Sequence, residues 1–316
     1  MLFGLRFDVN MKKWVLDIKL GSDPGRVKPV NEDRGYFQQD FDSQGNNIAI
    51  CAVADGMGGL EAGERASEIT TQYLYRWWEE RVKVLISEFN DLHNPFYDQK
   101  SNVTMELNEN NRQPLLQSTP LEKVAQELDQ VFTQINNALI LEGRQMGKRI
   151  GTTLSVLFLY GQDYVIKHIG DSRIYRVTGQ AELLTEDHSW VANQVKMGRL
   201  TAEEAKHHPS RHVLTQCLGV NDNISPFLGH GTLHGDELIL LCSDGFYTMV
   251  EEIQWLKYLK QFRTKAHDLQ TTLDQLVALA NQNGGHDNIT IILVKGINDN
   301  KGKMSYIGKM IEWFKK

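Results

Sequence analysis

The segment Cys51-Ala52-Val53-Ala54-Asp55-Gly56-Met57-Gly58-Gly59 constrains this chain more than any other stretch. The apolar run 48–54 predicts a buried strand, which ends on Asp55 and passes directly into a glycine-rich turn. Glycine tolerates close approach of the backbone and positive φ angles. A carboxylate at such a strand end can point, together with the next backbone carbonyl, at one hard cation. A plain Asp-Gly hairpin turn has the same local pattern, so this segment alone leaves both interpretations open.

Further acidic groups lie at predicted strand ends far away in the sequence. Asp244 follows the apolar run 238–243, Asp287 precedes the β-rich run 289–294, and Asn31-Glu32-Asp33 follows a turn-rich stretch. Unpaired carboxylates repel one another, so a cluster of them needs cations or protons. If these strands are neighbours, their acids converge and predict a metal site.

Eight short segments, spread over about residues 15–296, contain these acids and other motifs. They are Lys28-Pro29-Val30-Asn31-Glu32-Asp33, Ala54-Asp55-Gly56-Met57-Gly58-Gly59 with Gly63-Glu64, Gly151-Thr152-Thr153, Gly170-Asp171-Ser172-Arg173-Ile174-Tyr175, Leu184-Thr185-Glu186-Asp187-His188, Leu214-Thr215-Gln216-Cys217-Leu218-Gly219, Ser243-Asp244-Gly245 and Asp287-Asn288-Ile289-Thr290. In this order they resemble the metal-dependent serine/threonine protein phosphatases of type 2C, the PPM family, in their bacterial form. Any one segment is weak evidence, whereas the ordered set is specific.

The resemblance and the strand-end chemistry lead to the same metal ligands. We expect Asp55 to bridge two ions with help from the Gly56 carbonyl, and Asp244 and Asp287 to complete one of the two metals. Two more acids complete the set: Glu32 would serve the other metal, and Asp33 would hold bound waters. Waters in the remaining positions suit Mg²⁺ or Mn²⁺ rather than zinc.

Two other positions extend the expected site. The resemblance implies a third, weaker cation near Asp171, and the alternative is a turn aspartate that caps the backbone of Ser172 and Arg173. Lys28 precedes Asn31 at the spacing where the family places a phosphate-holding arginine. Lysine can hold a phosphate as a point charge but not as a bidentate fork. We expect Lys28 to bind the substrate phosphate and to contribute to catalysis.

The proton donor to the leaving group stays unassigned. Many bacterial members have a histidine where this chain has Leu60, and Met57 stands where eukaryotic relatives have a histidine proposed as general acid. His286 adjoins Asp287 but lies at a variable place, so a water on a metal is the favoured donor.

The expected activity is that of a phosphoprotein phosphatase. It would hydrolyse phosphoserine and phosphothreonine monoesters with a water activated by two metal ions, without a covalent intermediate. The substrate would be a phosphorylated protein, and the activity would oppose that of a Ser/Thr kinase. One alternative is a pseudophosphatase that binds phosphoproteins without turnover, but all five expected carboxylates are present. Another is a nuclease or small-molecule phosphatase, and the net charge of −6 disfavours the nuclease and nucleic-acid binding in general.

The fold class implied by the resemblance is α/β (α+β), with two antiparallel sheets packed as a sandwich and flanked by helices on both outer faces. Motifs from both ends of the chain would build one site, so we expect one domain over residues 1–296. Within it we expect a loop insertion at about 90–118 and a flap at about 198–213 that affects substrate choice. Residues 297–316 would form a polar linker and a short amphipathic tail.

Several helices are predicted from periodicity and capping motifs. Thr119-Pro120-Leu121-Glu122 is a capping box that begins a helix ending near residue 146, and Thr201 with Glu204 is a second capping box. The other predicted helices cover residues 61–87, 188–197, 251–262 and 266–280.

The sequence also indicates where the protein would work. The apolar content of 41% and the charged content of 23% are ordinary for a globular protein, and no run is long enough to span a bilayer. No signal peptide is expected at the N-terminus, and Cys51, Cys217 and Cys242 are expected to be reduced core residues. These features favour a cytoplasmic monomer. The apolar stripe of the tail, Ile307-Met310-Ile311-Phe314, would suit a membrane surface or a partner helix, but docking on its own domain or fraying is favoured.

Overall fold

The computed structural model describes residues 13–58, 61–92, 119–235, 237–264 and 268–299. The predicted insertion beyond residue 92, Leu60 and the tail from residue 300 onward lie outside the described residues. The two strands nearest the chain ends, β1 (Lys13–Asp23) and β11 (Ile289–Asp299), pair along their whole length. Strand β11 therefore continues past the boundary expected at residue 296, because Asn298 and Asp299 pair with the start of β1.

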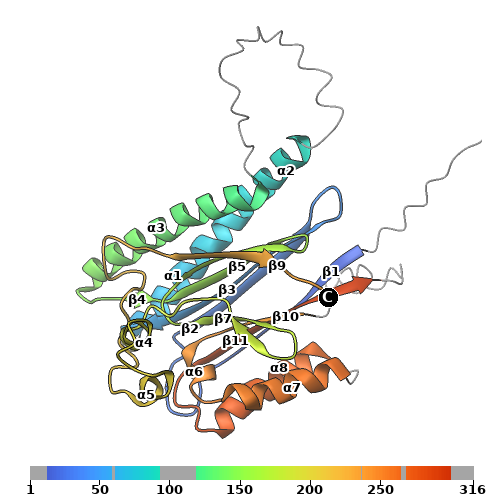
Figure 1. Ribbon diagram of the computed structural model, residues 1–316. Helices are drawn as coiled ribbons and strands as arrows, with labels where there is room; N and C mark the ends of the chain where they lie inside the picture. Colours follow the sequence, from blue (N-terminus) through green and yellow to red (C-terminus); the bar gives the residue numbers. More distant parts are fainter. Residues whose placement is uncertain (1–12, 59–60, 93–118, 236, 265–267, 300–316) are drawn as a thin grey trace, which may run out of the picture.

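Two antiparallel sheets stack face to face, which confirms the predicted fold class (Figure 1). The first sheet has the order β1-β11-β10-β7-β8, where β10 is Leu238–Cys242, β7 is Arg173–Val177 and β8 is Ala181–Leu183. The second has the order β2-β3-β5-β6-β9, where β2 is Asp33–Phe41, β3 is Asn47–Met57, β5 is Leu154–Tyr160, β6 is Asp163–Ile169 and β9 is Phe227–Thr232. A short strand, β4 (Gly151–Thr152), pairs with the end of β3.

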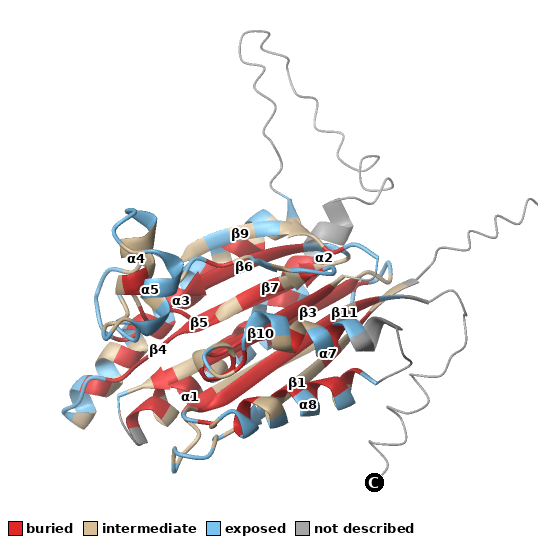
Figure 2. Ribbon diagram, turned by 60° about the horizontal axis from the view of Figure 1, so that its bottom comes forward, coloured by how far each residue is buried: buried red, intermediate tan, exposed pale blue. Residues whose placement is uncertain are grey.

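Helices cover both outer faces of the sandwich (Figures 1 and 2). The second sheet is covered by α1 (Glu61–Trp77), α2 (Lys83–Leu92) and α3 (Pro120–Met146). The first sheet is covered by α7 (Glu252–Thr264) and α8 (Leu269–Gln282). The short helices are α4 (Trp190–Lys196), α5 (Ala202–His207) and α6 (Asp244–Tyr247). Both predicted capping boxes are present, at Thr119 with Glu122 and at Thr201 with Glu204.

The helix predicted over residues 61–87 contains an irregularity and runs further. A π-helical turn, η1 (Trp78–Val82), joins α1 to α2. Trp77 and Trp78 are both buried and both rings lie against Phe158 of β5. Adjacent residues of a regular α-helix point about 100° apart, so the wider turn provides a reason why both indoles can pack on one sheet.

Successive side chains of β3 point alternately to the two faces of the strand and so belong to two different hydrophobic cores. Ile48, Ile50, Ala52 and Ala54 pack toward α1 and α3, whereas Ala49, Cys51 and Val53 pack between the two sheets. Successive strand residues point to opposite faces, so Asp55 continues the inner series. The carboxylate of Asp55 therefore lies at the end of the inter-sheet core.

The remaining expectations from composition concern cysteines and membrane spans. Cys51, Cys217 and Cys242 are buried and unpaired, as predicted. Among the described residues, the helices are all too short or too polar to cross a membrane.

Candidate active site

Aspartates from both sheets converge at one end of the sandwich. Asp33 lies directly opposite Asp55 in the β2–β3 register. Asp244 begins α6 immediately after β10, and Asp287 stands two residues before β11. Loss of solvation and then repulsion from Asp33, Asp244, Asp171 and Asp287 raise the pKa of Asp55 well above its usual range. Four aspartates from distant parts of the chain therefore lie within electrostatic reach of Asp55.

Asp33 ties the two sheets together. Its side chain is only 1% exposed and accepts a hydrogen bond of 2.6 Å from the hydroxyl of Ser243, at the end of β10 in the other sheet. The backbone N–H of Thr290 donates to the same hydroxyl oxygen at 3.0 Å. Burial raises the pKa of Asp33 to about 8, against the opposing effect of hydrogen bonds from Ser243 and Thr290. Sequence reasoning missed Ser243 and Thr290 as partners of Asp33, although strand alternation places both on the inner face.

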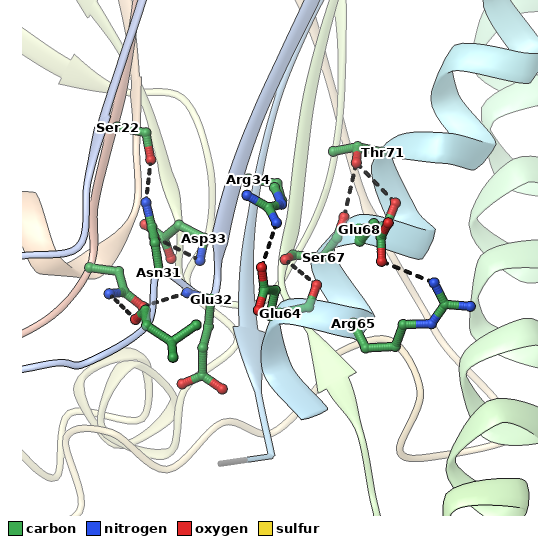
Figure 3. Close-up of polar contacts among 12 residues, drawn as sticks. Ser22, Asn31, Glu32, Asp33, Arg34, Glu64, Arg65, Ser67, Glu68 and Thr71 are labelled. Carbon is green, nitrogen blue, oxygen red and sulfur yellow. Dashed lines mark hydrogen bonds and ion pairs between the residues drawn. The ribbon is translucent and has the colours of Figure 1, made fainter. Parts of the chain in front are cut away.

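Glu32 has a carboxylate oxygen without a hydrogen-bond partner in the part of the chain that the structure describes. Its backbone N–H donates to Asn288 Oδ1 at 2.8 Å, which fixes the main chain. Burial raises the pKa of Glu32, and the positive charge of Lys28 and a hydrogen bond from the Gly63 backbone oppose that rise. Among the described residues, Glu32 Oε1 is buried without a hydrogen-bond partner. Figure 3 shows this carboxylate directed away from the neighbouring pair Arg34–Glu64.

Asn288 anchors the loop that carries Glu32 and Lys28. Its side-chain amide donates to the carbonyl oxygens of Pro24 and Val30, each at 2.9 Å. The sequence marked Asn288 only as the neighbour of Asp287, and its anchoring role follows from contacts more than 250 positions apart in the chain.

Close backbone packing explains two of the motif glycines. A Cβ on Gly56 would lie 2.1 Å from the carbonyl oxygen of Gly63, and a Cβ on Gly245 would lie 2.0 Å from that of Asn288. Neither glycine has a positive φ angle. Both are required because backbones approach one another closely around Asp55 and Asp244.

The main chain of Asp55 is held on both sides. Its N–H donates to the hydroxyl of Thr153 at 3.0 Å, and its carbonyl accepts from the hydroxyl of Thr152 at 2.9 Å. The Gly56 N–H donates to the carbonyl of Glu32 at 3.2 Å. Asp55 and Gly56, where the sequence predicted a turn, instead belong to the end of β3, and their backbone is held in place by these hydrogen bonds.

Lys28 lies at the rim of the acidic cluster. Its ammonium is 2.9 Å from Asp287 Oδ1, and both side chains are partly exposed. Partial burial alone would lower the pKa of Lys28. The hydrogen bond with Asp287 and the charges of Glu32 and Asp55 outweigh that effect, so the pKa of Lys28 lies above its usual value. The predicted phosphate-binding cation is thus charged and pairs with a predicted metal ligand.

Asp171 faces the same cluster from the turn between β6 and β7. Burial and the charges of Asp244 and Asp187 raise its pKa well above the usual range. The hydroxyl of Tyr247 in α6 donates to the Asp171 carbonyl at 3.1 Å. Arg173 pairs with Asp187 at 2.7 Å and lies over the Tyr247 ring at 3.8 Å, so its guanidinium is engaged in contacts within the fold.

The chemistry of this cluster fits divalent cations. Across the part of the chain that the structure describes, no three His, Cys, Asp or Glu side chains are gathered closely enough to hold a metal ion as they stand. The donors are nevertheless carboxylate oxygens, the type that Mg²⁺ and Mn²⁺ prefer, and Glu32 Oε1 lacks a partner among these residues. Because Asp287 pairs with Lys28, binding of a cation there requires a side-chain rearrangement.

Comparisons with known proteins agree with this architecture. A family model described as protein phosphatase 2C matches residues 29–289. The chain is 31% identical over 284 residues to the serine/threonine phosphatase stp of Listeria monocytogenes, covering 89% of this chain and 96% of that protein. The solved structure of the Streptococcus agalactiae serine/threonine phosphatase superposes with a TM-score of 0.67 at 29% identity, covering 89% of this chain and 99% of that one.

A further solved structure bears on the metal. The catalytic domain of the serine/threonine protein phosphatase PstP, in complex with two manganese ions, has a TM-score of 0.65 and 25% identity, covering 90% of this chain and 99% of that chain. The fold and the sequence matches define a phosphatase with two stacked sheets. The chain belongs to the protein phosphatase 2C family and is a protein serine/threonine phosphatase.

Proposed function

We propose that this protein hydrolyses phosphoserine and phosphothreonine monoesters in phosphorylated proteins with Mg²⁺ or Mn²⁺ as cofactor. The observation that supports the proposal is that Asp33 lies opposite Asp55 in the β2–β3 register and that Asp244 and Asp287 lie close enough to repel the charge of Asp55. Such a group of like charges is costly unless cations or protons compensate it. The manganese ions in the related PstP structure support the choice of cofactor.

The proposed ligands follow the geometry of the strand ends. Asp55 and the Gly56 carbonyl would bridge two ions, Asp244 and Asp287 would complete one of the two sites, and Glu32 would serve the other. Asp33 is held by Ser243 and Thr290 and would position the waters around the ions. When bound, the two ions would lower the pKa of a water and orient it toward the phosphorus, so that no covalent enzyme intermediate forms.

Two more residues have proposed roles at the edge of this site. Lys28 would leave Asp287 and place its ammonium against the phosphate oxygens. Asp171 would contribute to a third, weaker cation, which is supported by the repulsion between Asp171 and the carboxylates of Asp244 and Asp55.

The biological setting is also part of the proposal. The substrate would be a phosphoprotein modified by a Ser/Thr kinase, and the enzyme would act as a monomer. Pairing of β1 with β11 supports one catalytic domain followed by a tail. Three buried unpaired cysteines support a reducing compartment such as the cytoplasm.

The test is metal-dependent phosphate release from p-nitrophenyl phosphate and from a phosphothreonine peptide. We expect turnover with Mn²⁺ and none with excess EDTA, and activity should return when Mn²⁺ is restored. A chain that binds the phosphopeptide but releases no phosphate at any Mn²⁺ concentration would be a pseudophosphatase. Release that is unchanged by EDTA would contradict the metal mechanism.

A further inference from the structure

Lys28 and Asp287 have different proposed tasks, and yet they contact one another. The Lys28 ammonium lies 2.9 Å from Asp287 Oδ1. The same oxygen accepts a hydrogen bond of 2.9 Å from the backbone N–H of Asn288. A carboxylate oxygen offers about two acceptor directions, so a cation that binds Oδ1 must displace one of these donors. A cation that binds the other oxygen still meets the positive charge of Lys28 across the same carboxylate.

The backbone that precedes Lys28 lies against the backbone that carries Asp287. The N–H of Arg26 donates to the carbonyl of Gly285 at 2.7 Å. Gly25 has a φ angle of +82°, and a Cβ on it would lie 2.4 Å from the carbonyl oxygen of Asp287. Only glycine fits at this position, so the two segments are in direct backbone contact.

Asn288 bonds to the backbone on both sides of Lys28. Its side-chain amide donates to the carbonyls of Pro24 and Val30, each at 2.9 Å. Asn288 directly follows Asp287 in the chain. The backbone of Lys28 is therefore held at a fixed position relative to Asp287, and the pairing of the two side chains is built into the fold.

The two side chains can nevertheless separate. The side chain of Lys28 is 38% exposed and that of Asp287 is 43% exposed. Ion pairs at such exposure are weak, and the lysine ammonium stands on a flexible stem. Lys28 can therefore exchange the carboxylate for another anion by rotating its own side chain, without movement of the backbone.

We propose that Lys28 competes with a divalent cation for Asp287, and that this competition couples cation binding to phosphate binding. The inference rests on the proposed phosphatase function and describes the regulation of that same site. The ammonium neutralises Asp287 and so weakens the binding of a cation there. A cation that takes Asp287 releases the ammonium, which is then available to the substrate phosphate. The chain would bind phosphoproteins well only when the cation is in place.

This coupling acts in both directions. A cation that favours phosphate binding is itself bound more tightly in the presence of phosphate, by the same factor. A phosphate group that draws Lys28 away from Asp287 removes the competitor of the cation. Direct contact between phosphate and cation also contributes to the coupling. The share of Lys28 is therefore the difference between the native chain and a variant without the ammonium.

The first test is the affinity for Mn²⁺, measured by isothermal titration calorimetry without phosphate. Lys28→Met removes the ammonium and keeps an unbranched side chain. Because an exposed ion pair is weak, we expect this variant to bind Mn²⁺ about twofold to fivefold more tightly than the native chain. A substitution that merely disturbed the site would weaken Mn²⁺ binding instead.

The second test repeats the titrations with saturating phenylphosphonate, a non-hydrolysable analogue of a phosphate monoester. The analogue should tighten Mn²⁺ binding in both chains. The tightening factor should be about twofold to fivefold larger in the native chain than in Lys28→Met, because only the native chain has an ion pair to break.

Arg26→Gln is the matched control. Arg26 is exposed on the same loop, and its guanidinium has no ion-pair partner within the described ranges. At about 0.15 M salt, where more distant charges are largely screened, this variant should change the Mn²⁺ affinity by less than about 1.5-fold. An equal gain in Arg26→Gln and Lys28→Met would reveal a general effect of charge and overturn the competition at Asp287.

The remaining outcomes separate this inference from the phosphatase proposal. Unchanged or weaker Mn²⁺ binding in Lys28→Met would overturn the competition, and equal tightening by phenylphosphonate in both chains would overturn the coupling. Either result could occur in a native chain that binds Mn²⁺ and hydrolyses p-nitrophenyl phosphate. A native chain that fails to do both would instead contradict the phosphatase proposal itself.

Discussion

The acids of the site differ in how much of their bonding capacity the protein already uses. Asp33 accepts hydrogen bonds from Ser243 and Thr290, and Asp287 pairs with Lys28. Glu32 Oε1 has no partner among the described residues. Hydrogen bonds and an ion pair therefore already occupy Asp33 and Asp287, whereas one carboxylate oxygen of Glu32 is unoccupied within the described part of the chain.

The first prediction at the residue scale concerns Asp244. Asp244→Asn should nearly abolish phosphatase activity at limiting Mn²⁺, because one ligand charge is lost. The same change should leave the EDTA-treated protein as stable as the native chain or more stable, since repulsion with Asp287 and Asp55 is relieved. Turnover and Tm are measured in parallel, with the exposed Asp274→Asn as control. Native turnover at limiting Mn²⁺ would show that Asp244 is not a ligand.

The second prediction concerns Lys28. Hydrogen bonds to charged groups contribute about 1.5–3 kcal/mol, so Lys28→Ala should lower kcat/KM by about 10- to 100-fold. Lys28→Arg should keep the activity, because a guanidinium can grip two phosphate oxygens at once. Steady-state kinetics on one phosphothreonine peptide measures both variants. If the alanine variant stays within about twofold of the native chain, Lys28 does not contact the phosphate.

At the scale of elements, α3 supports the segment that follows the flap. Asn136 in the middle of α3 is buried, and its amide donates to the carbonyls of Asn221 at 2.8 Å and Asp222 at 3.4 Å. Its side-chain oxygen accepts from the Gly219 N–H at 2.7 Å. One helix side chain therefore holds a loop that is connected to the flap and to the end of β4.

The third prediction compares two neighbouring residues of α3. Asn136→Ala should lower the free energy of unfolding by about 1–3 kcal/mol, because the Gly219 N–H is left buried without a partner. Asn137→Ala, at an exposed position of the same helix, should change it by less than about 0.5 kcal/mol. Urea unfolding in EDTA measures both. If both substitutions lowered the free energy of unfolding equally, the hydrogen bonds of Asn136 to the loop at residues 219–222 would not be what stabilises the protein.

At the scale of the whole molecule, the acidic cluster opposes folding when no cation is bound. Burial raises the pKa of Asp33 to about 8, and the pKa values of Asp55, Asp171 and Asp244 are raised as well. An unfolded aspartate titrates near its ordinary value of about 3.9. Between these values the folded state binds more protons than the unfolded state, so its stability falls as pH rises.

The fourth prediction follows from this decrease of stability with rising pH. In EDTA, Tm should fall as pH rises from about 6.5 to about 8, and Mn²⁺ should raise Tm more at the upper end than at the lower end. This window lies above the range in which His168 contributes, because burial lowers its pKa to about 3 from an ordinary value of 6.5. Asp33→Asn should flatten the dependence. A Tm that rises with pH in EDTA would show that the cluster is compensated in another way.

Local sequence patterns were sufficient to predict much of the secondary structure and to nominate candidate acids for the site. Two capping boxes are present where Thr119 and Thr201 predicted them, and the alternation of β3 agrees with a buried strand that ends on Asp55. These features depend on neighbours a few residues apart, so a single sequence contains the information. The convergence of distant acids was inferred through the resemblance to the phosphatase family.

Contacts between distant segments decided the rest. The π-helical turn that begins at Trp78 allows the indoles of Trp77 and Trp78 to pack on Phe158 together. Strand β11 extends to Asp299 because β1 pairs with it there. Three contacts join residues that are far apart in the chain: the ion pair of Lys28 with Asp287, the hydrogen bond from Ser243 to Asp33, and the hydrogen bond from Gly219 to Asn136. By itself the sequence determined the elements, the family and the candidate ligands, because these follow from local periodicity and ordered motifs. Only the tertiary structure decided which atoms pair at the site, because that depends on how the two sheets stack.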